Sequence, residues 1–187
     1  MRLAWGAALV LALVGCGSSS SNAPVETTAS PHGHGHHAPA AETSASDPID
    51  RALDDVARIH GAPGPWAVAG YRMAQYALAK LHLPQGSFDL EITHRTPKKV
   101  QFSCIADGAQ AYSGASAGKL NLTLVEAPEA ELVTIYRNKK TAESLALRPS
   151  ASFRARYLDA DRARARELGR EVMQLPDDQV FEEVPAR

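Results

Sequence analysis

The N-terminal 46 residues constrain the fold most, because neither of their two parts is expected to join the hydrophobic core. An apolar run over residues 3–14 follows a single cation and is too short to span a bilayer, which is typical of a secretory signal. Residues 17–46 are mostly Gly, Ser, Ala, Thr, Pro and His, and such a segment buries too little apolar surface to repay the entropy of ordering. We therefore expect three parts: a signal peptide over 1–15, a disordered tether over 16–46, and one folded domain over 47–187.

The end of the apolar run predicts a lipid anchor. Its last residues, Leu13-Val14-Gly15-Cys16, resemble the bacterial lipobox, in which the Cys thiol receives a diacyl group with chains such as palmitate. Two or more acyl chains suffice for stable anchoring, so we expect Cys16 to hold the protein to a membrane of the bacterial envelope. Gly17, where an Asp would retain a lipoprotein in the inner membrane, favours the outer membrane of a Gram-negative cell. An ordinary signal peptide is the alternative, and it would need an A-x-A-like cleavage site.

Histidines in the tether form a possible metal-binding tract. The tract places four imidazoles within six residues, at His32, His34, His36 and His37. Such a cluster can chelate transition metals such as Zn, Ni or Cu, although a flexible tether does not preorganise the geometry. The alternative is a polar tether in which the histidines are incidental.

Charge and composition exclude several classes of protein. The chain has 20 basic and 21 acidic residues, a net charge of -1 and no basic block, so we expect no nucleic-acid binding. With 44% hydrophobic residues, the 47–187 segment can bury one ordinary core. Two cysteines cannot build a disulfide framework if Cys16 carries lipid.

Hydrophobic periodicity predicts an α+β domain. Asp47 is suited to cap a first helix that begins at Pro48 and ends before Gly61. The remaining expected elements are a helix over 66–81, a strand over 88–95, an extended piece over 98–102, a helix over 104–112 capped by Ser103, strands over 120–127, 130–137 and 141–148, a charged helix over 158–173, and a short closing helix from 176. This order favours helices packed on a mixed sheet, in the order helix-helix-strand-helix-strands, with C-terminal helices.

Several polar residues receive structural interpretations. Arg72 is expected to be an exposed cation on its helix, and His82 and His94 are expected to lie on the surface. The arginines between Arg162 and Arg170 alternate with acidic residues, a pattern that favours a solvated helix face over an anion site.

Four ordered motifs carry a resemblance to a known family. They are HG at 60–61, GYRM at 70–73, SCIADGAQ at 103–110 and SGASAGKLNL at 113–122. In this order and spacing they resemble the FmdE family of formylmethanofuran dehydrogenase proteins, whose pattern runs HGHxCPG, a GYRM-like helix, SCAVDAIQ and TGCTxGKGNL. The resemblance covers about residues 55–184 and implies a mixed α+β fold, in agreement with the pattern analysis.

The departures from that family pattern concern its expected metal or redox site. Ala62, Gly64 and Ala115 stand where the pattern has a second His and two further Cys. His60, Cys104 and Asp107 remain, and three protein ligands plus water are enough for zinc or another transition metal.

Each of these three residues also has a structural interpretation. Cys104 can be a small buried apolar residue, His60 can interact with the dipole at the end of its helix, and Asp107 can bond a neighbouring loop.

No motif for a catalytic mechanism is present: the chain lacks a Gly-rich phosphate loop, GxSxG, HExxH and CxxC. We therefore expect a protein, not catalytic, that binds a metal ion or small ligand in the pocket of its family. The alternatives are an envelope protein-interaction module with a vestigial pocket, for which the sequence names no partner, and a redox enzyme that uses Cys104.

Overall fold

The computed structural model describes residues 47–186, which lie in one compact unit. The expected signal peptide, the lipidated Cys16, and the tether with His32, His34, His36 and His37 lie outside the described residues. No helix within 47–186 is long and apolar enough to cross a membrane.

The first half of the domain alternates helices with two parallel strands. Its elements are α1 (Pro48–His60), α2 (Pro65–Lys80), β1 (Leu90–Thr96), α3 (Val100–Ser113), the 3-10 turn η1 (Ala117–Lys119) and β2 (Leu122–Glu126). The Asp47 side chain accepts a hydrogen bond from the Ile49 N–H and so caps α1, as expected. Because α3 carries the chain back across the sheet, β2 pairs parallel with β1.

The second half completes the sheet and adds the C-terminal helices. Its elements are the 3-10 turn η2 (Glu129–Glu131), β3 (Val133–Asn138), β4 (Ser144–Pro149), α4 (Ala151–Tyr157), the 3-10 turn η3 (Arg162–Arg164), α5 (Ala165–Gln174), α6 (Asp177–Val180) and β5 (Phe181–Val184). The strand order is β2-β1-β3-β4-β5, and all pairs other than β1 with β2 are antiparallel. The expected α+β class with a mixed sheet and C-terminal helices is confirmed.

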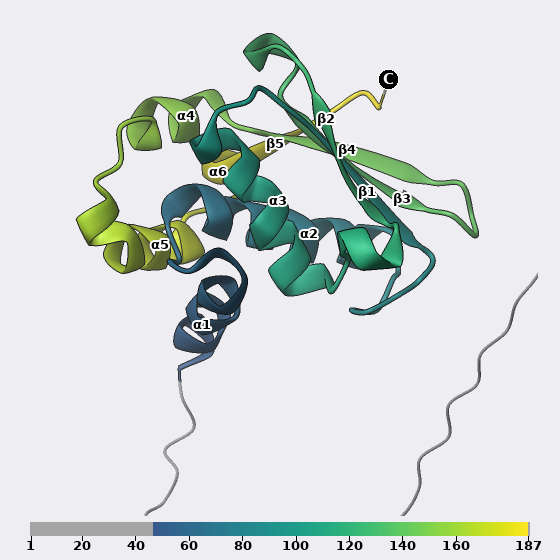
Figure 1. Ribbon diagram of the computed structural model, residues 1–187, viewed down its shortest axis with the longest axis horizontal. Coiled ribbons are helices and arrows are strands. Elements are labelled where there is room, and N and C mark those ends of the chain that lie inside the picture. The colour runs from purple at the N-terminus through teal and green to yellow at the C-terminus, as the bar shows by residue number, and fades with distance from the viewer. Residues whose placement is uncertain (1–46, 187) are drawn as a thin grey trace, which may run out of the picture. The chain divides into compact units, whose positions relative to one another are not determined.

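The helices gather on one side of the sheet, with α2 and α3 nearest to it (Figure 1). Large side chains fill the space between these layers, among them Met73, Ile92, Phe102, Ile105 and Tyr136, all fully buried. This burial is the main source of stability, since each fully buried aliphatic or aromatic side chain contributes roughly 1.5–3 kcal/mol relative to its exposed state.

Helices α2 and α3 approach so closely that only glycine fits at their crossing. A Cβ at Gly108 would lie 1.7 Å from the Ala67 carbonyl oxygen, and one at Gly70 would lie 2.0 Å from the Ile105 carbonyl oxygen. The small residues that the sequence places on one face of α2 therefore serve backbone contact between the two helices.

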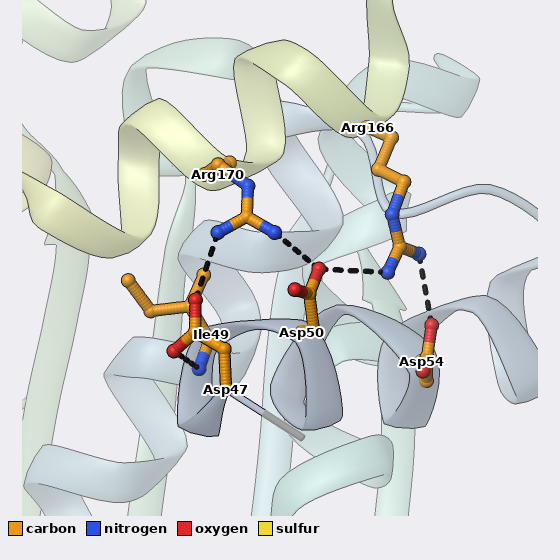
Figure 2. A network of polar contacts seen from close by, with 6 residues as sticks. All are labelled: Asp47, Ile49, Asp50, Asp54, Arg166 and Arg170. Carbon is orange, nitrogen blue, oxygen red and sulfur yellow. Dashed lines mark hydrogen bonds and ion pairs between the residues drawn. The ribbon is translucent and has the colours of Figure 1, made fainter. Parts of the chain in front are cut away.

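Ion pairs join α1 to α5 (Figure 2). Arg166 reaches Asp54 at 2.8 Å and Asp50 at 3.0 Å, and Arg170 reaches Asp47 at 3.0 Å and also pairs with Asp50. The face is solvated as expected, since the Arg166 and Arg170 side chains are 48% and 37% exposed, and it also bonds a helix that is far away in the sequence.

Three expected element boundaries are wrong. The piece over 98–102 is not extended, because α3 already begins at Val100 and its first turn buries Phe102 against Trp66. The expected helix over 158–173 is not continuous: residues 158–161 are not helical, Asp161 caps η3, and α5 begins only at Ala165. After α6, the chain adds β5 to the edge of β4.

Two polar side chains are buried where the surface was expected. His94 is fully buried, because β1 continues to Thr96 and α3 covers it. The Arg72 side chain is only 11% exposed: its guanidinium donates to the carbonyls of Val172 and Leu175, the end of α5, and pairs with Asp177. His82 is exposed, as expected.

Candidate functional site

A cavity of about 780 Å³ lies where three segments of the chain meet. The segments are the end of α1 with the start of α2 (60–67), the first turn of α3 (100–104), and the link from α4 to α5 (157–165). This volume is within the range typical of small-molecule sites.

Side-chain hydrogen bonds to backbone carbonyls, together with close helix packing, hold the three segments together. The Trp66 indole N–H donates to the Tyr157 carbonyl at 2.8 Å, and the Gln101 amide donates to the Leu158 carbonyl at 3.4 Å. Helix α5 packs directly on the turn that precedes α2, since a Cβ at Gly169 would lie 2.0 Å from the Pro63 carbonyl oxygen. The segments that line the cavity are therefore held in place by hydrogen bonds and helix packing.

An aromatic cluster supports Trp66, whose ring lines the cavity. The Trp66 ring meets Phe102 and Phe153 edge to face, with centroids 5.0 and 5.1 Å apart. Both phenylalanines are fully buried, so they hold the indole in one orientation.

His60 is the last residue of α1 and lines the cavity. Gly61, with φ of 87°, ends the helix there and turns the chain toward α2. The His60 Nδ1 lies 2.8 Å from Asp107 Oδ2 on α3, and the two side chains are 22% and 44% exposed. Asp107 does not line the cavity, so its carboxylate positions the imidazole from outside.

Cys104 lies one helical turn before Asp107 and also lines the cavity. The residue is 8% exposed, and its S–H donates to the Val100 carbonyl at 2.8 Å. Burial, and secondarily the negative charge of Asp107, raises the pKa of the Cys104 thiol to about 11. The side chain is therefore a protonated thiol at neutral pH and a poor nucleophile.

Arg162 is a site residue that the sequence analysis missed. It lies on η3 and lines the cavity, and its positive charge acts on the Cys104 thiol against the effect of burial. Because the charged stretch was interpreted as one solvated helix, nothing in the sequence distinguished Arg162 from its neighbours. Trp66 and Gln101 also line the cavity and were not among the candidates, because only the folded chain brings them to it.

The structure brings together part of the expected metal site. His60 and Cys104 line one cavity, as do Ala62 and Gly64, which stand at ligand positions of the family pattern. Ala115 is buried beyond the C-terminal end of α3 and does not line the cavity. Among residues 47–186 no group of three or more His, Cys, Asp or Glu side chains is placed to hold a metal ion. Zinc binding by His60, Cys104 and Asp107 therefore stays a prediction, and the placement of these three side chains does not support it.

A family model decides the classification. The model described as FmdE, Molybdenum formylmethanofuran dehydrogenase operon, matches residues 59–182, more than half of the chain. The chain belongs to the FmdE family. The matched range begins beside His60 and ends within β5, so it contains all three segments that line the cavity. No curated protein matches the chain.

Proposed function

We propose that the FmdE domain binds a small organic ligand in the cavity and catalyses no reaction on it. The observation that carries this proposal is the cavity itself, which is lined in part by His60 and Gly61 of the HG motif and Cys104 of the SCIADGAQ motif and has the volume of a small-molecule site. A single metal ion would fill a small part of 780 Å³. The protonated thiol of Cys104 supports binding without covalent catalysis.

A ligand-binding measurement with a cavity-filling variant tests this function. The full chain, purified in detergent, is titrated with a panel of small organic acids, amides and amines and, separately, with Zn²⁺ and Ni²⁺. Calorimetry and tryptophan fluorescence report binding, since the Trp66 ring lines the cavity. At least one organic ligand is expected to saturate at one site per chain.

Ala62 provides the blocking variant. It is exposed and lines the cavity, so Ala62→Phe should abolish organic-ligand binding while the fold persists. Ala130→Phe is the matched control at an exposed position on η2, outside the cavity. Equal affinity in Ala62→Phe and wild type, or no saturable organic ligand, contradicts the proposal. Saturable Zn²⁺ binding that persists after His32, His34, His36 and His37 are all replaced by Ala would instead favour a metal site in the folded domain.

We also propose that lipid on Cys16 anchors this domain to the bacterial envelope. The support is the lipobox-like Leu13-Val14-Gly15-Cys16 directly after a short apolar run. On this proposal the tether over 16–46 separates the ligand-binding domain from the membrane surface.

A further inference from the structure

An arginine on the cavity wall without an ion-pair partner in the described part of the chain points to the class of ligand, an inference that rests on the proposed function. Arg162 has no carboxylate within ion-pair distance among residues 47–186. Its neighbours on the same stretch are paired: Arg164 contacts Glu167, and Arg166 contacts Asp54 at 2.8 Å. Arg162 thus differs from the neighbouring arginines, because it lines the cavity and has no ion-pair partner there. Its guanidinium is available to a ligand.

None of the other polar groups that line the cavity forms an ion pair with Arg162. Asp161 also lines the cavity, but its carboxylate caps η3, with Oδ1 accepting a hydrogen bond from the Ala163 N–H at 2.9 Å, and it is not within ion-pair distance of Arg162. Asp107 contacts His60 and does not line the cavity. The Cys104 side chain is a neutral thiol that donates to a carbonyl.

Two helix N-termini add positive potential to that of Arg162. The first residues of α2 and α3 line the cavity, and the caps of these helices, Gly64 and Lys99, make no side-chain hydrogen bond to the first-turn N–H groups. Helix dipoles favour an anion at such ends.

Besides His60 and Gln101, most of the remaining cavity wall is apolar. Trp66 contributes an aromatic ring, and Val100 and Leu158, which are 79% and 44% exposed, are large hydrophobic residues that line the same cavity. A ligand that fits these surroundings combines one negative group with a hydrophobic body.

We propose that the cavity binds a small organic carboxylate with an apolar body, and that the Arg162 guanidinium pairs with its carboxylate. An Arg–carboxylate pair can form two parallel hydrogen bonds, which fixes orientation as well as affinity. The apolar body then lies against Trp66 and Leu158, and the thiol of Cys104 is not consumed.

Matched acids and amides test this assignment. The full chain in detergent is titrated with benzoate, phenylacetate and hexanoate, and with benzamide, phenylacetamide and hexanamide, at one pH and ionic strength. At least one acid is expected to bind tenfold or more tightly than its amide. Arg162→Gln should remove this preference and leave amide binding unchanged, and Arg162→Lys should restore part of it. Arg164→Gln is the control, because Arg164 is paired with Glu167 and does not line the cavity.

The outcomes separate this inference from the function on which it rests. Equal binding of acid and amide by the wild type, with binding blocked in Ala62→Phe, overturns the carboxylate assignment and keeps the cavity as a ligand site. An acid preference that survives Arg162→Gln also overturns the role of Arg162. Absence of binding by all six compounds overturns the assignment, and the wider panel then decides the proposed function separately.

Discussion

At the scale of single residues, His94 shows how burial overrides sequence pattern. Its Nδ1 lies 2.9 Å from the Thr134 hydroxyl and its Nε2 lies 3.1 Å from the Phe102 carbonyl. Since a carbonyl only accepts, Nε2 carries the proton and Nδ1 accepts from Thr134. Both ring nitrogens are therefore satisfied by a neutral imidazole.

This burial makes stability depend on pH. It lowers the pKa of His94 from 6.5 to about 4, so between those values the unfolded chain binds more protons than the folded one. Neutral His94 therefore stabilises the fold fully above pH 6.5. As pH falls toward 4, the free energy of unfolding decreases by about 3 kcal/mol. Urea unfolding at a series of pH values measures it.

His94→Gln provides the variant for this measurement, because glutamine can donate to Phe102 and accept from Thr134 without titrating. Its stability should vary less between pH 7 and pH 4 than that of the wild type. His82→Gln, at an exposed position, should retain the full dependence. Parallel curves for His94→Gln and wild type would show that another group causes the loss.

Cys104 should be nearly inert to alkylation in the folded protein. With the pKa of its thiol near 11 and 8% exposure, only about one molecule in a thousand carries the thiolate at pH 8. Iodoacetamide should therefore modify Cys104 far more slowly in buffer than in 8 M urea, as peptide mass spectrometry can resolve. Similar rates in both conditions would return the redox-enzyme alternative to consideration.

At the scale of elements, the crossing of α2 and α3 depends on glycine. Gly108→Ala forces a Cβ into the Ala67 carbonyl, so the helices must separate, and we expect a loss of at least about 2 kcal/mol in the free energy of unfolding. Gly118→Ala is the control, since its Cβ would meet only the Ser116 hydroxyl at 3.9 Å. Chemical denaturation measures both, and equal stabilities of the two variants would contradict the close approach.

The pairing of α1 with α5 should depend on salt. The Arg170 side chain, together with Arg166, holds the pKa of Asp50 below its usual range. The stability that the Asp50 ion pairs contribute is therefore also lost as pH falls through that lowered pKa. Asp50→Asn should lower the melting temperature in dilute buffer, and the difference from wild type should shrink by half or more in 0.5 M NaCl. Glu167→Gln breaks only a local pair, with Arg164, and should change stability less. A difference that does not respond to salt would contradict an electrostatic origin.

At the scale of the whole molecule, the anchor is tested at the mature N-terminus. If Cys16 is lipidated, mass spectrometry of protein from bacterial membranes should find a chain that begins at Cys16 and carries acyl mass. Cys16→Ala should stay unprocessed, although its uncut apolar segment can still bind a membrane, so location alone is a weaker readout. A mature chain that begins elsewhere, or at Cys16 without acyl mass, would contradict the anchor.

The sequence by itself determined the α+β class, the first two helices and strands β1 to β4, because strong periodicity and Pro, Gly and Asp signals mark them locally. It also identified the FmdE family, whose motifs are short and ordered. It placed His60 and Cys104 among the candidate residues, and both line the cavity.

Only the tertiary structure decided what depends on contacts between distant segments. The burial of His94 and Arg72, the pairing of β5 with β4 and the division of the 158–173 stretch all follow from packing, which no local pattern encodes. The same holds for Arg162. Its neighbours find carboxylates on other turns and on α1, and its own position on η3 leaves it on the cavity wall. The sequence shows where charged residues lie along the chain, whereas the tertiary structure determines which of them form ion pairs.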